Sequence, residues 1–298
     1  MLADLLLLER LSDRDLALLA EVAGEPGSTE RRAARLRERP ADIEALLARH
    51  DVFAALFESA GEDPIVAVGS FVAFAVLLAG TPALLADLRF VPERVGRRST
   101  VPVFEIDPLR EFVADPLRRL FLADLLASYT HVASGALWVK SRRGWHHRRF
   151  SELDPAQFAE LILSVPPDER LALYRRLGDL ALFLTGVFPD HAGGRVLTPI
   201  AAARLRRAVG GGASPSGAEE LDGAGPGGAG AGDLGDLRLL EWAGRRAYGL
   251  AWEASGGELG LSPALGYVAE HFRHARLILN LLTDRYLFER RERWFSLG

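Results

Sequence analysis

The amino-acid sequence predicts a mainly α-helical protein, a multi-helix bundle with one short β-hairpin near residues 136–150. Apolar residues recur three and four positions apart along most of the chain, which is typical of helices that bury one face. Strand-like composition is confined to residues 136–150, where two short segments flank a turn that contains Gly144. Hydrophobic residues make up 49% of the 298 residues, which is enough to bury a substantial core.

The composition excludes several classes of function. The chain contains no cysteine, so disulfides, thiolate metal sites and thiol catalysis are ruled out. The formal net charge of −4 gives no overall positive field that would hold the protein on DNA or on an anionic membrane. The first residues include Asp4 and Glu9 and lack the basic start and cleavage site of a signal peptide. We therefore expect a soluble, cytoplasmic protein.

The longest apolar stretch bears on whether the chain enters a membrane. It covers Ile65–Ala79 and is ended by Gly80, Thr81 and Pro82. A helix that spans a bilayer needs about 20 apolar residues, and this stretch is shorter. It is therefore predicted to be a buried core helix, with membrane association as the alternative.

The other helices are predicted from periodicity and from signals at their ends. Asp154 and Pro155 have the residue types that cap and open a helix, and Pro166–Asp168 opens the next one. The prolines in Thr81–Pro108 favour short helical turns and extended connections. The predicted helices cover Leu2–Val22, Arg31–Leu47, Asp115–Ser134, Asp154–Leu163, Pro166–Phe188, Pro199–Val209, Gly235–Ser255 and Pro263–Trp294.

Residues 210–235 interrupt the helical pattern. They are almost all Gly, Ala, Ser, Pro and acidic residues without apolar periodicity, which predicts a flexible segment. The last predicted helix carries two adjacent apolar stripes, which its one helical neighbour in the C-terminal section is too small to cover. We therefore predict a single helical domain over residues 1–298, with residues 210–235 as an insertion within it.

One group of polar residues is a candidate for an interior polar pocket. Asp179 precedes the apolar run Leu180–Phe188, where burial or pairing shifts a carboxyl pKa; the alternative is a simple ion pair within the helix, with Arg175 or Arg176. Gly178 lowers helix stability, which indicates that another backbone packs closely there. The full set consists of Tyr129, His131, Tyr174, Asp179, His271 and His274.

Histidine spacing bears on metal binding. His271 and His274 lie three residues apart, which allows two imidazoles to share a metal, but the motifs of zincins and di-iron bundles are absent. The alternative is a pair of structural histidines beside a helix seam. We assign neither a metal nor a cofactor.

Two further polar features have structural alternatives. Asp124, Ser128 and His131 fall on one helix face and are candidates for a polar pocket, but a serine within a helix is a poor nucleophile. Asn280 lies among large aliphatic residues, which predicts a buried amide that fixes helix register.

A short segment carries a resemblance. The residues Tyr174-Arg-Arg-Leu-Gly178-Asp179-Leu-Ala-Leu-Phe-Leu-Thr-Gly186-Val-Phe-Pro189 resemble a helix of uncharacterised bacterial helical proteins. The resemblance implies a helix in which Tyr174, Gly178 and Asp179 form a set, and it implies no particular activity.

The predicted hairpin has an unusually basic composition. Between Lys140 and Arg149 the chain has five formal positive charges, two histidines and Trp145, with no acidic residue. Arginines bind phosphates and an aromatic ring stacks on bases, so a nucleic-acid contact is one interpretation. The other is a solvated hairpin whose arginines meet an acidic surface of the same protein or of a second subunit. The residues concerned are Arg142, Arg143, Trp145, Arg148 and Arg149.

Three hypotheses for the function follow. The favoured one is a non-catalytic helical protein that acts through a protein partner or through self-association, because no complete catalytic motif is present. The second is an enzyme or a small-ligand or metal binder that uses Tyr174, Asp179, His271 and His274. The third is a nucleic-acid binder that uses the basic hairpin, residues 140–149.

The third hypothesis predicts a specific loss of binding. Reversal of charge at Arg142, Arg143, Arg148 and Arg149 is expected to abolish affinity for nucleic acid, and the wild-type affinity is expected to fall as salt rises. Fluorescence anisotropy with labelled single- and double-stranded DNA measures both effects. Absence of wild-type binding at low salt would exclude this hypothesis.

Overall fold

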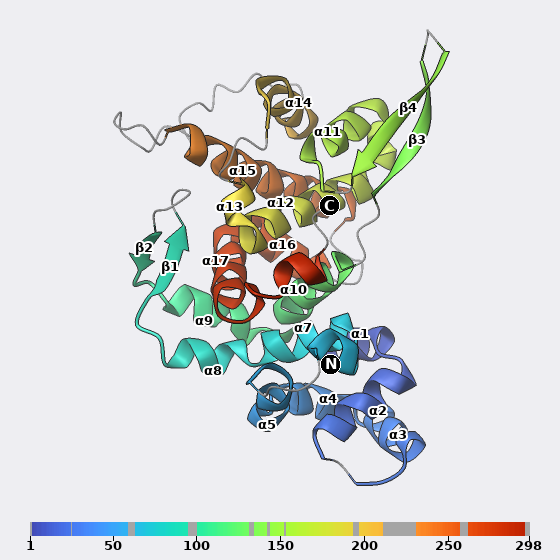
Figure 1. Cartoon of the computed structure of the whole chain (residues 1–298), viewed down its shortest axis with the longest axis vertical. Coiled ribbons are helices and arrows are strands. Elements are labelled where there is room, and N and C mark those ends of the chain that lie inside the picture. Colours follow the sequence, from blue (N-terminus) through green and yellow to red (C-terminus); the bar gives the residue numbers. More distant parts are fainter. Residues whose placement is uncertain are drawn as a thin grey trace. The chain divides into compact units, whose positions relative to one another are not determined.

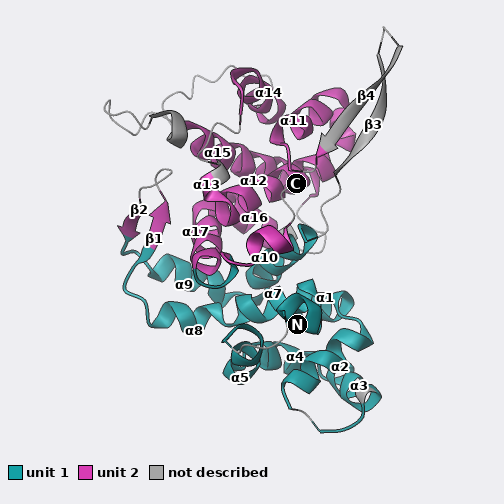
Figure 2. Cartoon of the chain, viewed as in Figure 1, with its two compact units in different colours: residues 1–91, 103–130, 285–287 teal, residues 92–102, 131–284, 288–298 magenta. Residues whose placement is uncertain are grey.

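The computed structural model is mainly helical and contains the predicted antiparallel hairpin (Figure 1). It divides into two compact units, shown in two colours in Figure 2. Unit 1 comprises residues 1–91, 103–130 and 285–287, and unit 2 comprises residues 92–102, 131–284 and 288–298. The structure describes residues 2–24, 26–58, 63–94, 100–130, 134–141, 144–151, 153–192, 197–210, 231–256 and 262–295.

The predicted domain organisation remains a prediction. Most of the insertion assigned to residues 210–235 lies outside the described residues. Its C-terminal end does not, because helix α15 (Ala231–Ala254) begins within the assigned range. The sequence predicted that this helix begins at Gly235, four residues later than it does, because Ala231 and Gly232 resemble the residues of the insertion in composition.

Unit 1 is built from short helices. The predicted Leu2–Val22 is two helices, because Ser12 caps the second one: its hydroxyl accepts from the Asp15 amide, and the Asp15 side chain accepts from the Ser12 amide. Pro40 likewise begins a new helix within the predicted Arg31–Leu47. The elements are α1 (Leu2–Arg10), α2 (Asp13–Val22), α3 (Thr29–Glu38), α4 (Pro40–Leu47), α5 (His50–Phe53), a π-helical turn (Ala54–Glu58), α6 (Pro64–Val68), α7 (Ser70–Ala79), α8 (Thr81–Ala86), α9 (Asp107–Ala114) and α10 (Pro116–Ser128).

The apolar stretch Ile65–Ala79 is buried, as predicted, but it is not one helix. Gly69 separates α6 from α7. Its backbone φ is 81°, a value that residues with a Cβ rarely adopt. All side chains of Val72–Leu78 are buried, and α7 packs against α10. Among the described residues, no helix is both long and apolar enough to cross a membrane.

Unit 2 is organised around α12 (Leu171–Val187), which packs against α15 and α17. Every residue from Leu177 to Val187 is buried, which confirms the predicted apolar run. Asp154 caps α11 through the Ala156 amide, also as predicted. The other elements are α11 (Pro155–Ser164), a 3-10 turn (Pro167–Glu169), α13 (Pro189–Ala192), α14 (Pro199–Val209), α16 (Ser262–Glu270), α17 (Phe272–Leu282) and α18 (Arg291–Trp294). A π-helical turn (Thr283–Leu287) follows α17, and its residues 285–287 belong to unit 1.

Gly178 allows α12 and α15 to approach closely. A Cβ at this position would lie 2.3 Å from Cδ1 of Tyr248, much closer than van der Waals contact permits. The sequence predicted close packing of another segment at Gly178, and α15 packs closely there, with the ring of Tyr248 nearest to the position of a Cβ. The absence of a side chain at Gly178 is therefore what accommodates the buried ring of Tyr248.

The predicted helix Pro263–Trp294 is wrong in its continuity. His271 has φ −110° and ψ 35°, outside the helical region, and separates α16 from α17. Directly after the break, Phe272 packs beside Tyr248 with the ring centroids 5.9 Å apart. The predicted seam is nevertheless buried at Leu265, Val268, Phe272, Ala275, Leu279 and Leu282.

The hairpin consists of β3 (Ser134–Ser141) and β4 (Gly144–Ser151), with Trp138 opposite His147 and Lys140 opposite Trp145. Because β3 begins at Ser134 and α10 ends at Ser128, the predicted helix Asp115–Ser134 is too long. A second two-stranded sheet, which the sequence did not predict, pairs β1 (Val91–Arg94) with β2 (Thr100–Val103).

The packing at Gly178 predicts the effect of an alanine. Gly178→Ala is expected to lower the free energy of unfolding of unit 2 by about 1–3 kcal/mol, because overpacking displaces the ring of Tyr248. Urea unfolding followed by tryptophan fluorescence measures this, since all five tryptophans lie in unit 2.

Gly249→Ala on α15 is the matched control. No atom lies within 4 Å of a Cβ at Gly249, so alanine is expected to leave stability unchanged or to raise it slightly. Equal effects of the two substitutions would contradict the packing explanation.

Candidate functional site

The candidate residues for a polar pocket are divided between the two units. Tyr129 is fully buried in unit 1, and His131 lies outside the described residues. Tyr174, Asp179, His271 and His274 belong to unit 2. The contacts of each described residue decide what it is able to do.

Asp179 makes structural contacts in the core of unit 2. Its Oδ1 accepts a hydrogen bond of 2.8 Å from the hydroxyl of Tyr248 on α15. Nε of Arg175, one turn earlier on α12, donates to both carboxylate oxygens at 3.1 and 3.3 Å. The intrahelical ion pair is therefore present, and Tyr248 adds a bond between helices. The bond to Tyr248 joins α12 to α15.

His271 lies at the break between α16 and α17, and His274 lies in the first turn of α17. The ring of His271 stacks on Tyr267 with centroids 4.0 Å apart, and His274 lies 5.5 Å from His271. Nδ1 of His271 is 3.1 Å from the carbonyl oxygen of Tyr267. Among the described residues, no group of three His, Asp or Glu side chains is placed to hold a metal ion.

The remaining polar candidates also have structural partners. Asp124 pairs with Arg10 at 2.6 Å, and the Ser128 hydroxyl donates to the Leu125 carbonyl. Asn280 is buried, as predicted, and its amide donates to two carbonyls of α12, those of Thr185 and Gly186, at 3.0 and 2.7 Å. This amide fixes how α17 lies along α12.

The basic hairpin remains a prediction. Arg142 and Arg143 lie outside the described residues. Trp145, Arg148 and Arg149 are on β4, where their backbones pair with Lys140, Leu137 and Ala136. The side chains of the hairpin lie outside the described part of the chain.

Sequence reasoning missed a buried charge cluster in unit 2. Glu93 of β1 accepts hydrogen bonds from the guanidinium groups of Arg273 and Arg276 on α17. Nε of Arg276 lies 3.0 Å from Oε2 of Glu241 on α15. The side chains of Glu93 and Arg276 are 9% and 3% exposed, so both charges are almost fully withdrawn from water.

The pKa of Glu93 shows that its arginine partners outweigh its burial. Burial is the largest single influence and by itself raises the pKa. The hydrogen bond from Arg273 and the charge and hydrogen bond of Arg276 act in the opposite direction, and the pKa lies below its ordinary value of 4.5. One sequence signal pointed to this cluster: Arg276 falls inside the apolar seam, between Phe272 and Leu279.

A second group of charges surrounds α13. Arg94 donates to Asp190 at 2.6 Å and to Asp284 at 3.0 Å. Arg291 bonds to Asp190 and to the Val187 carbonyl, at 3.3 and 3.1 Å. These bonds join the end of α12 to β1 and α18.

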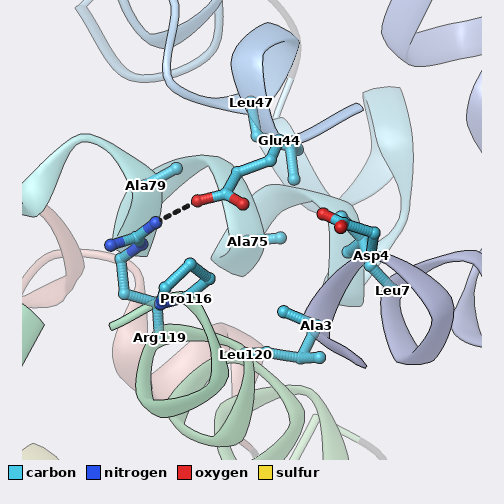
Figure 3. A pocket seen from close by; sticks show the side chains of 10 residues that line it. All are labelled: Ala3, Asp4, Leu7, Glu44, Leu47, Ala75, Ala79, Pro116, Arg119 and Leu120. Carbon is cyan, nitrogen blue, oxygen red and sulfur yellow. Dashed lines mark hydrogen bonds and ion pairs between the residues drawn. The ribbon is translucent and has the colours of Figure 1, made fainter. Parts of the chain in front are cut away.

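Figure 3 shows a small pocket in unit 1, lined by α1, α4, α7 and α10. Its volume is about 30 Å³, which leaves room for little more than a water molecule. Glu44 and Arg119 form an ion pair at its edge. The pocket is too small for a substrate.

An aromatic pair lies exposed on unit 1. Phe90 follows α8 and Phe104 precedes α9, and their ring centroids are 5.9 Å apart. The two side chains are 48% and 69% exposed. The two neighbouring rings form an exposed apolar patch. Exposed apolar patches are typical of interaction surfaces.

Fold and contacts together define a mainly helical protein in which Asp179, Asn280, Glu93 and Arg276 are bonded to other side chains or to backbone carbonyls. Comparison of the chain with protein-family models, with curated proteins and with solved structures finds no match. The resemblance of residues 174–189 to a bacterial helical family remains a prediction.

The charge cluster predicts the effect of neutralising Glu93. Glu93→Gln is expected to lower the free energy of unfolding of unit 2 by about 3 kcal/mol, because it removes the carboxylate that faces the buried guanidinium group of Arg276. Urea unfolding followed by tryptophan fluorescence measures the change. Glu253→Gln on α15, at an exposed site, is the control, and an equal effect there would contradict the role of the cluster.

The lowered pKa also predicts a dependence on pH. A carboxyl group whose pKa is lower in the folded state than in the unfolded state stabilises the fold fully when the pH is above the pKa of the unfolded state. This stabilisation is lost as the pH falls through the pKa of the folded state. The stability difference between wild type and Glu93→Gln is therefore expected to be full above about pH 4.5 and to shrink below it. A difference independent of pH would show that Glu93 does not act through its charge.

Proposed function

We propose that the protein is a non-catalytic helical protein that acts through self-association. The observation that carries the proposal is the exposed aromatic pair of Phe90 and Phe104. Burial of exposed aromatic side chains against another surface is a large source of binding free energy, and aromatic residues dominate the centres of many interfaces.

The residues beside the rings favour a second copy of the chain as the partner. Arg89 precedes Phe90 and Glu105 follows Phe104, and both charged side chains are exposed in unit 1. In a two-fold contact each surface meets itself, so Arg89 of one copy is able to pair with Glu105 of the other, twice. A patch with an apolar centre and one charge of each sign at its sides is complementary to itself.

The interior of unit 2 supports a non-catalytic role. Asp179, the carboxylate that the enzyme hypothesis requires, is bonded to Tyr248 and Arg175. Glu93 is likewise held by two arginines. A general acid or base must be able to reach a proton of the substrate. Asp179 and Glu93 are instead engaged in contacts between elements of unit 2.

The proposal predicts a concentration-dependent dimer. Sedimentation velocity over a range of protein concentrations is expected to show a monomer–dimer equilibrium, and Phe90→Ser with Phe104→Ser is expected to raise its Kd by about tenfold or more. Ile200→Ser, at a 66% exposed apolar residue of unit 2, is the control and is expected to leave the Kd unchanged.

A charge exchange tests the two-fold arrangement. Arg89→Glu and Glu105→Arg are each expected to weaken the dimer, and the double exchange to restore it, because the pairs are then formed with opposite polarity. A chain that stays monomeric at all concentrations, or a dimer indifferent to the phenylalanine substitutions, would contradict the proposal.

A further inference from the structure

Unit 1 contains a second and larger pocket, lined by α2, α3 and α4 and by Arg49 beyond α4. Its volume is about 300 Å³, at the lower end of the range for sites that bind small molecules. The buried side chains of Leu36 and Leu46 supply an apolar lining. The pocket therefore offers room and apolar contact for a small organic molecule.

Three arginines line the same pocket. Arg32 and Arg35 are three residues apart on α3 and so share a helix face, and Arg49 joins them. Arg49 is held in place: its guanidinium donates to Asp51 at 3.0 and 2.6 Å and to the Ala23 carbonyl at 3.0 Å. Because the guanidinium is already held in place, it loses little conformational entropy when it binds a ligand.

Arg32 has a hydrogen-bonding group that its surroundings do not satisfy. Its Nη1 lies 3.8 Å from Oε2 of Glu21, which is an ion pair too long for a hydrogen bond. Its Nε is buried and has no hydrogen-bond acceptor among the described residues. A buried N–H group without an acceptor is costly, and an oxygen bound in the pocket would remove that cost.

We propose that this pocket binds a small organic oxyanion, a phosphate or carboxylate group carried on a short apolar body. The oxyanion accepts from the guanidinium groups, in the paired geometry that arginine favours, and the body contacts Leu36 and Leu46. Asp42 also lines the pocket, and its exposed carboxylate disfavours a ligand with negative charge along its whole length. The proposal uses no residue of the Phe90–Phe104 surface and stands or falls independently of self-association.

Titration calorimetry of the full chain with hexyl phosphate, hexanoate, inorganic phosphate and hexylammonium tests the ligand class. Hexyl phosphate or hexanoate is expected to bind with one site per chain, inorganic phosphate more weakly and hexylammonium not at all. Failure of both hexyl anions to bind would overturn the proposal and leave water as the occupant. Equal binding of inorganic phosphate and hexyl phosphate would also overturn it, because the apolar lining would then contribute nothing.

Two substitutions with the same change of charge locate the site. Arg32→Gln is expected to weaken binding of the hexyl anion by about tenfold or more, because it removes a charged donor. Arg31→Gln, at an adjacent exposed residue that does not line the pocket, is expected to leave binding unchanged. Equal losses in both variants would show general electrostatic attraction and would overturn the assignment.

A third variant separates loss of the site from loss of the fold. Ala45 lines the pocket but is exposed, so Ala45→Phe fills the space while all three arginines remain. Its thermal unfolding is expected to match wild type and its affinity for the hexyl anion to be lost. Wild-type affinity in Ala45→Phe would place the ligand elsewhere.

Discussion

The packing of α12 against α15 and α17 is the constraint on which unit 2 depends. Gly178 leaves room for the ring of Tyr248, and the hydroxyl of that ring then reaches the carboxylate of Asp179, the next residue on α12. Further along α12, Asn280 of α17 bonds to the carbonyls of Thr185 and Gly186. Close approach and buried polar bonds reinforce each other, because each bond is satisfied only when the helices lie in this register.

The buried charges follow the same logic. Moving Glu93 and Arg276 out of water costs several kcal/mol for each ion, and an excellent geometry with additional hydrogen bonds is needed to offset it. Glu93 has two arginine partners, and Arg276 has two glutamate partners. These partners lower the pKa of Glu93 in spite of its burial, and the cluster ties β1 to α17 and α15.

These contacts change which residues are candidates for function. The polar residues that draw attention in the sequence, Asp179 above all, are engaged in the packing of unit 2. The features suited to recognition are in unit 1: an exposed pair of phenyl rings, and a pocket in which arginines meet an apolar lining. The proposed self-association uses the first feature, and the proposed oxyanion site uses the second.

Local patterns were sufficient to predict the helical fold, the burial of Val72–Leu78 and Leu177–Val187, the cap at Asp154 and the hairpin, because periodicity, capping and turns involve residues near each other in the chain. The breaks at Gly69 and His271 and the exposure of Phe90 and Phe104 were not predictable in this way. Glu93 and Arg276 are 183 residues apart, and no local pattern relates them. Such contacts exist only once the chain has folded, since distant segments then compete for the same buried space and for the same hydrogen-bond partners.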